Sequence, residues 1–177
     1  DLNPTLGSDA EIDQLTQVGT RVFFVAFTTE AGEELWVTDG TAAGTYMVKD
    51  IVPGRADPYI KELTEVNGTL FFSSDDGIHG RELWKSDGTA EGTVLVEDVE
   101  AGPVSSTPED LADMEGILYC RAFKTGFGRE LLRSDGTAEG TYLIDVIDFC
   151  DSRVCASSYP HALASVNGIV YFRGTST

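Results

Sequence analysis

The sequence predicts an all-β fold made of repeated four-stranded antiparallel sheets, and three observations support this fold class. A unit of 48 residues recurs along the chain, as Glu34, Glu82 and Glu130 illustrate. Each unit contains short runs of β-branched and aromatic residues separated by glycine-containing turns, which is typical of strands and hairpins. No stretch shows the i, i+3, i+4 apolar spacing of an amphipathic helix. Four strands in a unit of this length is the size of a β-propeller blade.

The repeat rests on two sets of segments that align without gaps. The first set is Glu34–Thr41, Glu82–Thr89 and Glu130–Thr137. The second set is Val18–Phe24, Val66–Phe72, Met114–Cys120 and Val166–Phe172, in which the last step is 52 residues instead of 48. The chain therefore holds three complete units and the opening half of a fourth.

The second unit illustrates the expected elements in order. Leu63–Val66 shows a short apolar–polar alternation and is expected to form the first strand. Asn67-Gly68 follows, and this dipeptide favours the positive φ angles of a type I′ hairpin turn. Thr69–Ser74 is rich in aromatic and β-branched residues and is expected to form the second strand. Asn67-Gly68-Thr69 also matches a glycosylation sequon, and the sequence leaves open whether Asn67 carries a glycan.

The second half of the unit continues in the same way. Asp75-Asp76-Gly77 with Gly80 predicts a turn before the third strand, Arg81–Lys85. A turn around Asp87-Gly88-Thr89 then precedes the fourth strand, Thr93–Val99. A solenoid of stacked hairpins is the alternative architecture, although its units are usually shorter.

We expect residues 1–177 to form one β-propeller domain or a fragment of one. The predicted blades are 12–59, 60–107, 108–159 and an incomplete blade 160–177. A propeller removes its exposed sheet edges only by closure. The chain is therefore expected to be part of a larger propeller, completed by other chains or by the rest of a longer repeat protein.

The charge of the chain excludes several partners. It contains 12 Lys+Arg and 30 Asp+Glu, for a formal net charge of −18 at pH 7. Nucleic acid is not an expected partner, because phosphate binding depends on basic side chains. Membrane insertion is not expected either, because no run approaches the roughly 20 apolar residues of a spanning helix. Hydrophobic residues make up 41% of the chain, enough to form a core.

The repeated segments that begin at Glu34, Glu82 and Glu130 resemble the motif of the ELWxxDGT-repeat family of bacterial secreted and cell-surface proteins, often described as hyalin-like. Glu34–Thr41 and Glu82–Thr89 match the motif in full, whereas Glu130–Thr137 has Leu132 in place of the tryptophan. The resemblance covers nearly the whole chain. It implies a β-propeller array in a large extracellular or cell-surface protein, and it brings no catalytic residues to this sequence.

The Asp-Gly-Thr turns are the most conspicuous polar feature of the repeat. Aspartate in such a turn accepts hydrogen bonds from backbone N–H groups two residues on, while glycine adopts the positive φ. We therefore expect a structural role for these residues, with a ligand or ion site as the alternative. The residues are Asp39, Gly40, Asp87, Gly88, Asp135 and Gly136.

No catalytic or metal site is predicted. Glu34, Glu82 and Glu130 recur once per unit and are expected to be hydrogen-bonding or ion-pairing positions of the framework. The two histidines, His79 and His161, have no second histidine at metal-ligand spacing. No acidic segment has the ligand series of a calcium loop, so we expect no cofactor and retain calcium as an alternative.

The three cysteines have different expected roles. Cys120 aligns with Phe24 and Phe72 and is expected to be buried. Cys150 and Cys155 lie in the connector that carries the four extra residues between the third and fourth units. We expect a disulfide between them, in keeping with an oxidising compartment, with free thiols or a metal site as alternatives.

The predicted function is a non-catalytic extracellular repeat module for adhesion, surface assembly or binding of a partner or glycan. The alternative is an extracellular hydrolase or lyase, or an accessory subunit of one, with a site at the propeller mouth. Differences between the units distinguish the binding-module hypothesis from the enzyme hypothesis. An active site needs polar groups that do not recur in every unit.

Overall fold

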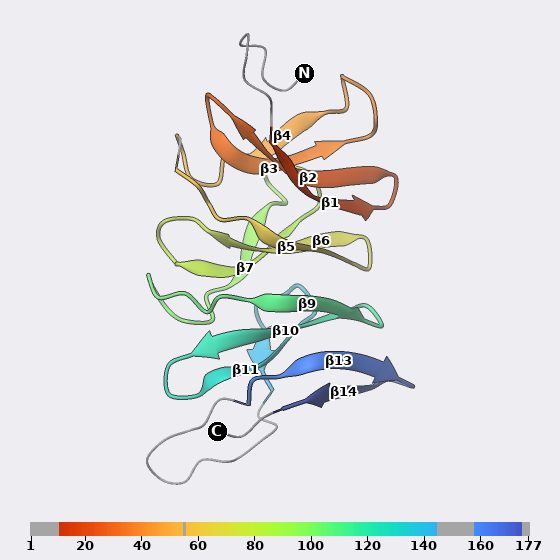
Figure 1. Ribbon diagram of the computed structural model, residues 1–177, viewed down its shortest axis with the longest axis vertical. Helices are drawn as coiled ribbons and strands as arrows, with labels where there is room; N and C mark the ends of the chain where they lie inside the picture. The colour runs from red at the N-terminus through yellow and green to blue at the C-terminus, as the bar shows by residue number, and fades with distance from the viewer. Residues whose placement is uncertain (1–10, 55, 145–157, 175–177) are drawn as a thin grey trace.

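The computed structural model describes residues 11–54, 56–144 and 158–174, which form strands joined by turns and loops (Figure 1). In this part of the chain no helix is long and apolar enough to cross a membrane. The all-β class and the repeated four-stranded units predicted from the sequence are confirmed.

In the described residues, four antiparallel sheets follow one another in sequence order. The first contains β1 (Ile12–Val18), β2 (Arg21–Thr28), β3 (Gly32–Thr38) and β4 (Tyr46–Lys49). The second contains β5 (Lys61–Val66), β6 (Thr69–Asp75), β7 (Arg81–Ser86) and β8 (Val94–Glu97). The third contains β9 (Glu109–Met114), β10 (Ile117–Lys124), β11 (Gly128–Ser134) and β12 (Tyr142–Leu143). The fourth contains β13 (His161–Val166) and β14 (Ile169–Arg173).

The sheets are stacked along the long axis of the molecule, from β1–β4 at one end to β13–β14 at the other (Figure 1). Strands within each sheet pair in sequence order. The first strands of neighbouring sheets lie against one another, β1 on β5, β5 on β9, and β9 on β13. The described residues form an open stack, so the closed propeller stays a prediction.

The hairpin between the first and second strands of the second sheet has the predicted geometry. Asn67 and Gly68 have φ angles of 50° and 83°, as a type I′ turn requires. Glu115-Gly116 and Asn167-Gly168 adopt the same pair of positive φ angles in the third and fourth sheets. The turn that the Asn-Gly dipeptide favours is therefore also formed where glutamate replaces asparagine.

Every first strand also contains an irregularity that the sequence analysis did not predict. One residue in each has a positive φ, and the pairing register shifts around it; these residues are Gln14, Glu62, Asp110 and Ala162. Such bulges bend a strand and turn its side chains. The side chains of two of these positive-φ residues make hydrogen bonds toward the next sheet. Gln14 Nε2 donates to the Ile60 carbonyl at 2.9 Å. Glu62 Oε2 accepts from the Leu111 N–H at 3.4 Å.

The hydrophobic core consists of layers between successive sheets. Neighbouring residues of β6 point to opposite faces, so Phe72 packs between the first and second sheets while Phe71 packs between the second and third. Trp84 and Leu83 divide in the same way on β7. The predicted burial of Cys120 is confirmed, and burial raises the pKa of its thiol above the usual range. Cys150 and Cys155 lie outside the described residues, so their disulfide stays a prediction.

Candidate functional site

The Asp-Gly-Thr turns are held together by their own side chains. Asp87 Oδ1 accepts hydrogen bonds from the Thr89 N–H at 2.8 Å and from the Thr89 hydroxyl at 2.7 Å. The Thr89 hydroxyl oxygen in turn accepts from the Gly92 N–H at 3.0 Å. These hydrogen bonds from threonine hold the pKa of Asp87 below its usual value. One carboxylate oxygen of Asp87 is thus engaged inside the turn.

The other two turns repeat this arrangement. Asp39 and Asp135 accept from the corresponding threonines at 2.7–3.0 Å. The glycine at the end of each turn is required for it, because a Cβ on Gly92 would lie 2.2 Å from the Asp87 carboxylate carbon. The same approach occurs at Gly44 and Gly140. These three glycines recur at steps of 48 residues, and their role in the turn becomes visible only in the structure.

The repeated glutamates hold the linkers, which join the fourth strand of one sheet to the first strand of the next. Glu82 is fully buried on β7. Its Oε2 accepts from the Val99 N–H at 3.3 Å, and its Oε1 accepts from the Ser106 N–H at 2.8 Å. The Ser106 hydroxyl also donates to Oε2. Glu130 accepts from the N–H and the hydroxyl of Ser158 in the same way. The predicted framework role of these glutamates is confirmed by these hydrogen bonds.

Glu34 differs from the other two because proline occupies the position of the serine. Pro58 aligns with Ser106 and has neither an N–H nor a hydroxyl to donate. Glu34 Oε2 accepts from the Ile51 N–H at 3.2 Å, whereas its buried Oε1 has no hydrogen-bond partner among the described residues. Burial raises the pKa of Glu34 to about 8 and that of Glu82 to about 7. Both carboxyl groups are fully buried, and their hydrogen bonds are made with linker residues.

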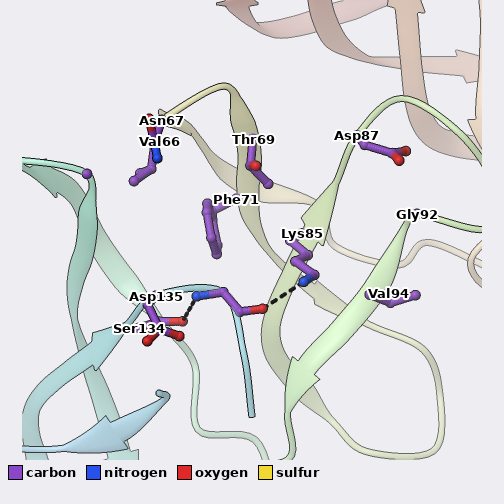
Figure 2. A pocket seen from close by; sticks show the side chains of 12 residues that line it. Val66, Asn67, Thr69, Phe71, Lys85, Asp87, Gly92, Val94, Ser134 and Asp135 are labelled. Carbon is purple, nitrogen blue, oxygen red and sulfur yellow. Dashed lines mark hydrogen bonds between the residues drawn. The ribbon is translucent and has the colours of Figure 1, made fainter. Parts of the chain in front are cut away.

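The candidate binding site is a pocket of about 420 Å³ between the second and third sheets. Asn67, Thr69, Phe71, Lys85 and Val94 line it from the second sheet and its turns. The third sheet contributes the turn with Asp135 and Gly136. Figure 2 shows Phe71 and Lys85 projecting toward this turn, where Lys85 Nζ donates to the Gly136 carbonyl at 2.7 Å. The volume falls within the range of small-molecule sites, about 300–1,000 Å³.

The corresponding space between the first and second sheets is occupied by larger side chains. Arg21 aligns with Thr69, and its Nη2 donates to the Asp87 carbonyl at 2.6 Å. Tyr46 aligns with Val94, and its hydroxyl donates to the Gly88 carbonyl at 3.0 Å. The pocket is therefore a difference between units: two short side chains leave space where an arginine and a tyrosine cross from sheet to sheet.

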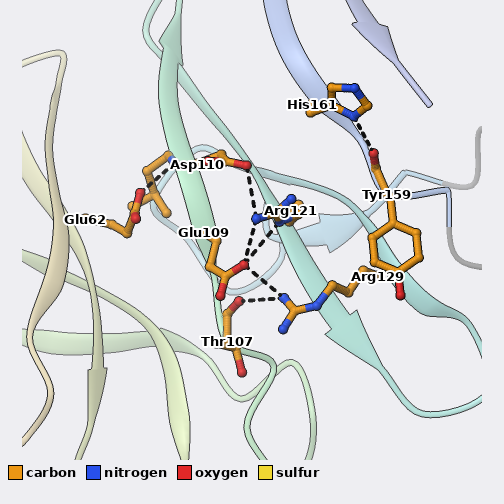
Figure 3. Close-up of polar contacts among 9 residues, drawn as sticks. Glu62, Thr107, Glu109, Asp110, Arg121, Arg129, Tyr159 and His161 are labelled. Carbon is orange, nitrogen blue, oxygen red and sulfur yellow. Dashed lines mark hydrogen bonds and ion pairs between the residues drawn. The ribbon is translucent and has the colours of Figure 1, made fainter. Parts of the chain in front are cut away.

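A second feature specific to one unit is an ion-pair network on the third sheet (Figure 3). Glu109 Oε2 lies 2.9 Å from Arg121 Nη2 and 3.3 Å from Arg129 Nη1, and Asp110 Oδ2 lies 3.4 Å from Arg121 Nη2. Val25 and Ser73 occupy the position of Arg121 in the preceding units. These contacts join β9, β10 and β11, and the carboxylates and guanidinium groups compensate one another.

The histidines and acidic segments do not converge on one site. His79 Nδ1 lies 2.7 Å from Asp76 Oδ2, and this hydrogen bond raises the pKa of His79. His161 Nδ1 makes a hydrogen bond to the Tyr159 carbonyl at 2.8 Å. Among residues 11–54, 56–144 and 158–174, no group of three or more His, Cys, Asp or Glu side chains could hold a metal ion.

The structure brings together only part of the predicted site set. Asp87, Asp135 and Gly136 line the pocket, whereas Asp39 and Gly40 belong to the first sheet. Thr69, Lys85 and Val94 were not predicted as site residues; a comparison of aligned side-chain sizes would have singled out Thr69 and Val94. Comparisons with known proteins found no matching family model, no similar curated protein and no similar solved structure.

Proposed function

We propose that this chain is a non-catalytic extracellular repeat module that binds a partner or a glycan in adhesion or surface assembly. The main observation behind the proposal is that the recurring polar residues and the pocket have different roles. The residues that recur in every unit hold turns and linkers, as Asp87 and Glu82 do. The pocket also borders on recurring turn residues such as Asp135, but its open space arises where the units differ, at Thr69 and Val94. A constant framework with a unit-specific recess suits recognition.

The proposal extends to the architecture, in which the stacked sheets are consecutive blades of a β-propeller. The contacts between successive first strands support it, because those strands line the centre of a propeller. The ELWxxDGT-type motifs and the resemblance they carry support an extracellular or cell-surface location. Other chains or further repeats of a longer protein would complete the ring alongside the two-stranded fourth sheet.

The function is tested by measuring binding and turnover in one experiment. The purified chain is incubated with a panel of insoluble neutral and acidic polysaccharides and with intact bacterial cells. We expect saturable retention on at least one surface, without release of reducing ends or of unsaturated products that absorb in the ultraviolet. Product release proportional to protein concentration would identify a hydrolase or lyase, and absence of retention on every surface would remove the binding function.

A further inference from the structure

We propose that the pocket between the second and third sheets binds a neutral, hydroxyl-rich ligand, a sugar unit of a glycan. This inference rests on the proposed binding function and specifies its ligand class. The first argument is that the pocket is built by substitution. Thr69 and Val94 align with Arg21 and Tyr46 of the first unit. Arg21 and Tyr46 cross the equivalent space between the first and second sheets and donate hydrogen bonds to the second sheet. The recess is therefore a local departure from an otherwise repeated packing scheme.

The second argument is the mixture of hydrogen-bonding groups that line the pocket. Asn67 offers an amide with both donors and acceptors, and Thr69 offers a hydroxyl. Lys85 donates one hydrogen bond to the Gly136 carbonyl, and its ammonium group has three donors. Asp135 contributes a carboxylate. A hydroxyl group both donates and accepts, so a ligand with several hydroxyls matches this set better than a ligand with only one kind of group.

The third argument is the charge balance, which disfavours ligands with a net charge. The negative charges of Asp87 and Asp135 are matched by the positive charges of Lys85 and Arg133, because Arg133 Nη1 lies 3.4 Å from Asp135 Oδ2. An anionic ligand meets two carboxylates, and a cationic ligand meets the lysine ammonium group in a confined space. The chain as a whole carries a formal charge of −18, which adds to the repulsion of anions. A neutral ligand avoids both penalties.

The fourth argument is that the pocket is apolar on one side and preorganised. Val66 and Phe71 are buried at 3% exposure each and, with Val94, supply an apolar wall for the C–H face of a sugar ring. The turn with Asp135 is closed by hydrogen bonds from Thr137 at 2.7 and 3.0 Å. A wall and turn that are already ordered reduce the entropic cost of binding.

The test uses the full chain labelled with ¹⁵N and a panel of neutral methyl pyranosides, with glucuronate and glucosamine as charged analogues. Neutral oligosaccharides form a second arm that distinguishes a free sugar from a glycan segment. We expect saturable amide shifts at Thr69, Lys85 and Gly136 with at least one neutral sugar. Binding of its charged analogues should be at least about tenfold weaker, a difference of about 1.4 kcal/mol.

Two double variants give the matched comparison. T69R/V94Y copies the residues of the first unit into the pocket and should abolish the shifts. I12T/L15T replaces two exposed residues of β1 that do not line the pocket, and it should leave the pocket titration unchanged. Circular dichroism and thermal unfolding test whether both variants are folded.

Three results would overturn the inference. They are preferential binding of a charged sugar, undiminished binding by folded T69R/V94Y, and absence of binding by every sugar probe. Retention of the wild-type chain on a cell or polysaccharide surface, measured separately, would in each case leave the proposed binding function standing. Loss of that retention as well would overturn both.

Discussion

At the scale of single residues, the buried glutamates show how one substitution changes the chemistry of a repeated position. Glu34 and Glu82 occupy the same place on β3 and β7, and both are fully buried. Ser106 supplies two hydrogen bonds to Glu82, whereas Pro58 supplies none to Glu34. A buried carboxylate without sufficient donors favours its neutral form.

This difference predicts a pH-dependent stability. The pKa of Glu34 is about 8 in the folded protein and near 4.5 when unfolded, so the folded state binds the proton more tightly. The stability that protonated Glu34 contributes is present below pH 4.5 and is lost as the pH rises toward 8. Pro58→Ser restores the missing donors, should lower the Glu34 pKa, and should flatten this loss. Chemical denaturation between pH 5 and 8.5 measures the slope, and ¹³C NMR of the Glu34 carboxyl measures the pKa.

Ser106→Ala provides the matched opposite change. It removes one hydroxyl donor to Glu82 and should raise the Glu82 pKa above about 7. We expect a loss of roughly 1–3 kcal/mol in the free energy of unfolding, since a buried acceptor loses a partner. Identical pH slopes in Pro58→Ser, Ser106→Ala and the wild type would contradict the role assigned to these donors. Replacing proline also raises the conformational entropy of the unfolded chain. This effect on the free energy of unfolding does not depend on pH, so it does not alter the pH slope.

A second prediction at the residue scale concerns the thiols. Cys120 is buried and its pKa is raised, so it should not react with a thiol reagent in the folded protein. The disulfide expected between Cys150 and Cys155 leaves one reactive thiol per chain after denaturation. Ellman titration with and without guanidinium measures both numbers. Three thiols in the denatured, unreduced chain would refute the disulfide.

At the scale of elements, the Asp-Gly-Thr turn is a unit in which side chain and backbone depend on each other. Asp87 Oδ1 holds Thr89, and Thr89 holds the N–H of Gly92. The absence of a side chain on Gly92 leaves room for the Asp87 carboxylate. We therefore expect a substitution of either Asp87 or Gly92 to disrupt the hydrogen bonds of the whole turn.

A double-mutant cycle tests this coupling. Asp87→Ala should lower the free energy of unfolding by about 1 kcal/mol, the usual size of a lost exposed turn hydrogen bond to a charged acceptor. Gly92→Ala should cost at least as much, because its Cβ displaces the same carboxylate. The double variant should cost less than the sum of the two, since the hydrogen bonds are lost only once. Additive effects in urea denaturation would show that glycine and aspartate act independently.

At the scale of the whole molecule, the stack has two unlike ends. The first three sheets each have four strands, whereas the fourth has two in the described residues. Val166, Ile169 and Tyr171 of the fourth sheet are each more than 50% exposed. Exposed apolar strands at a sheet edge favour pairing with further strands.

The proposed propeller predicts a native particle larger than the 19.1 kDa chain or self-association of the isolated chain. Native mass spectrometry and light scattering measure the particle mass. Tyr171→Lys and Ile169→Lys place charges on this sheet and should reduce self-association without unfolding the first three sheets. A monodisperse monomer with cooperative unfolding of all four sheets would argue against completion by further strands.

The sequence by itself determined the repeat, the strand order within each unit and the hairpin turns. These features depend on local signals: Asn67-Gly68 favours positive φ, and Leu83-Trp84 alternates between two faces. The burial of Cys120 also followed from alignment with phenylalanines at the same position of the repeat. The framework role of Glu82 was predicted because it recurs in every unit.

Only the tertiary structure decided which residues of different units meet. Thr69 and Lys85 line a pocket because the neighbouring sheet places Gly136 opposite them, and no signal within one unit encodes that approach. The unpartnered oxygen of Glu34 likewise depends on a linker residue 24 positions away, Pro58. The bulges at residues such as Glu62 arise where strands of neighbouring sheets are packed together. Local sequence specifies strands and turns through short-range backbone preferences, whereas spaces between sheets are set by the sizes of side chains that converge from distant segments.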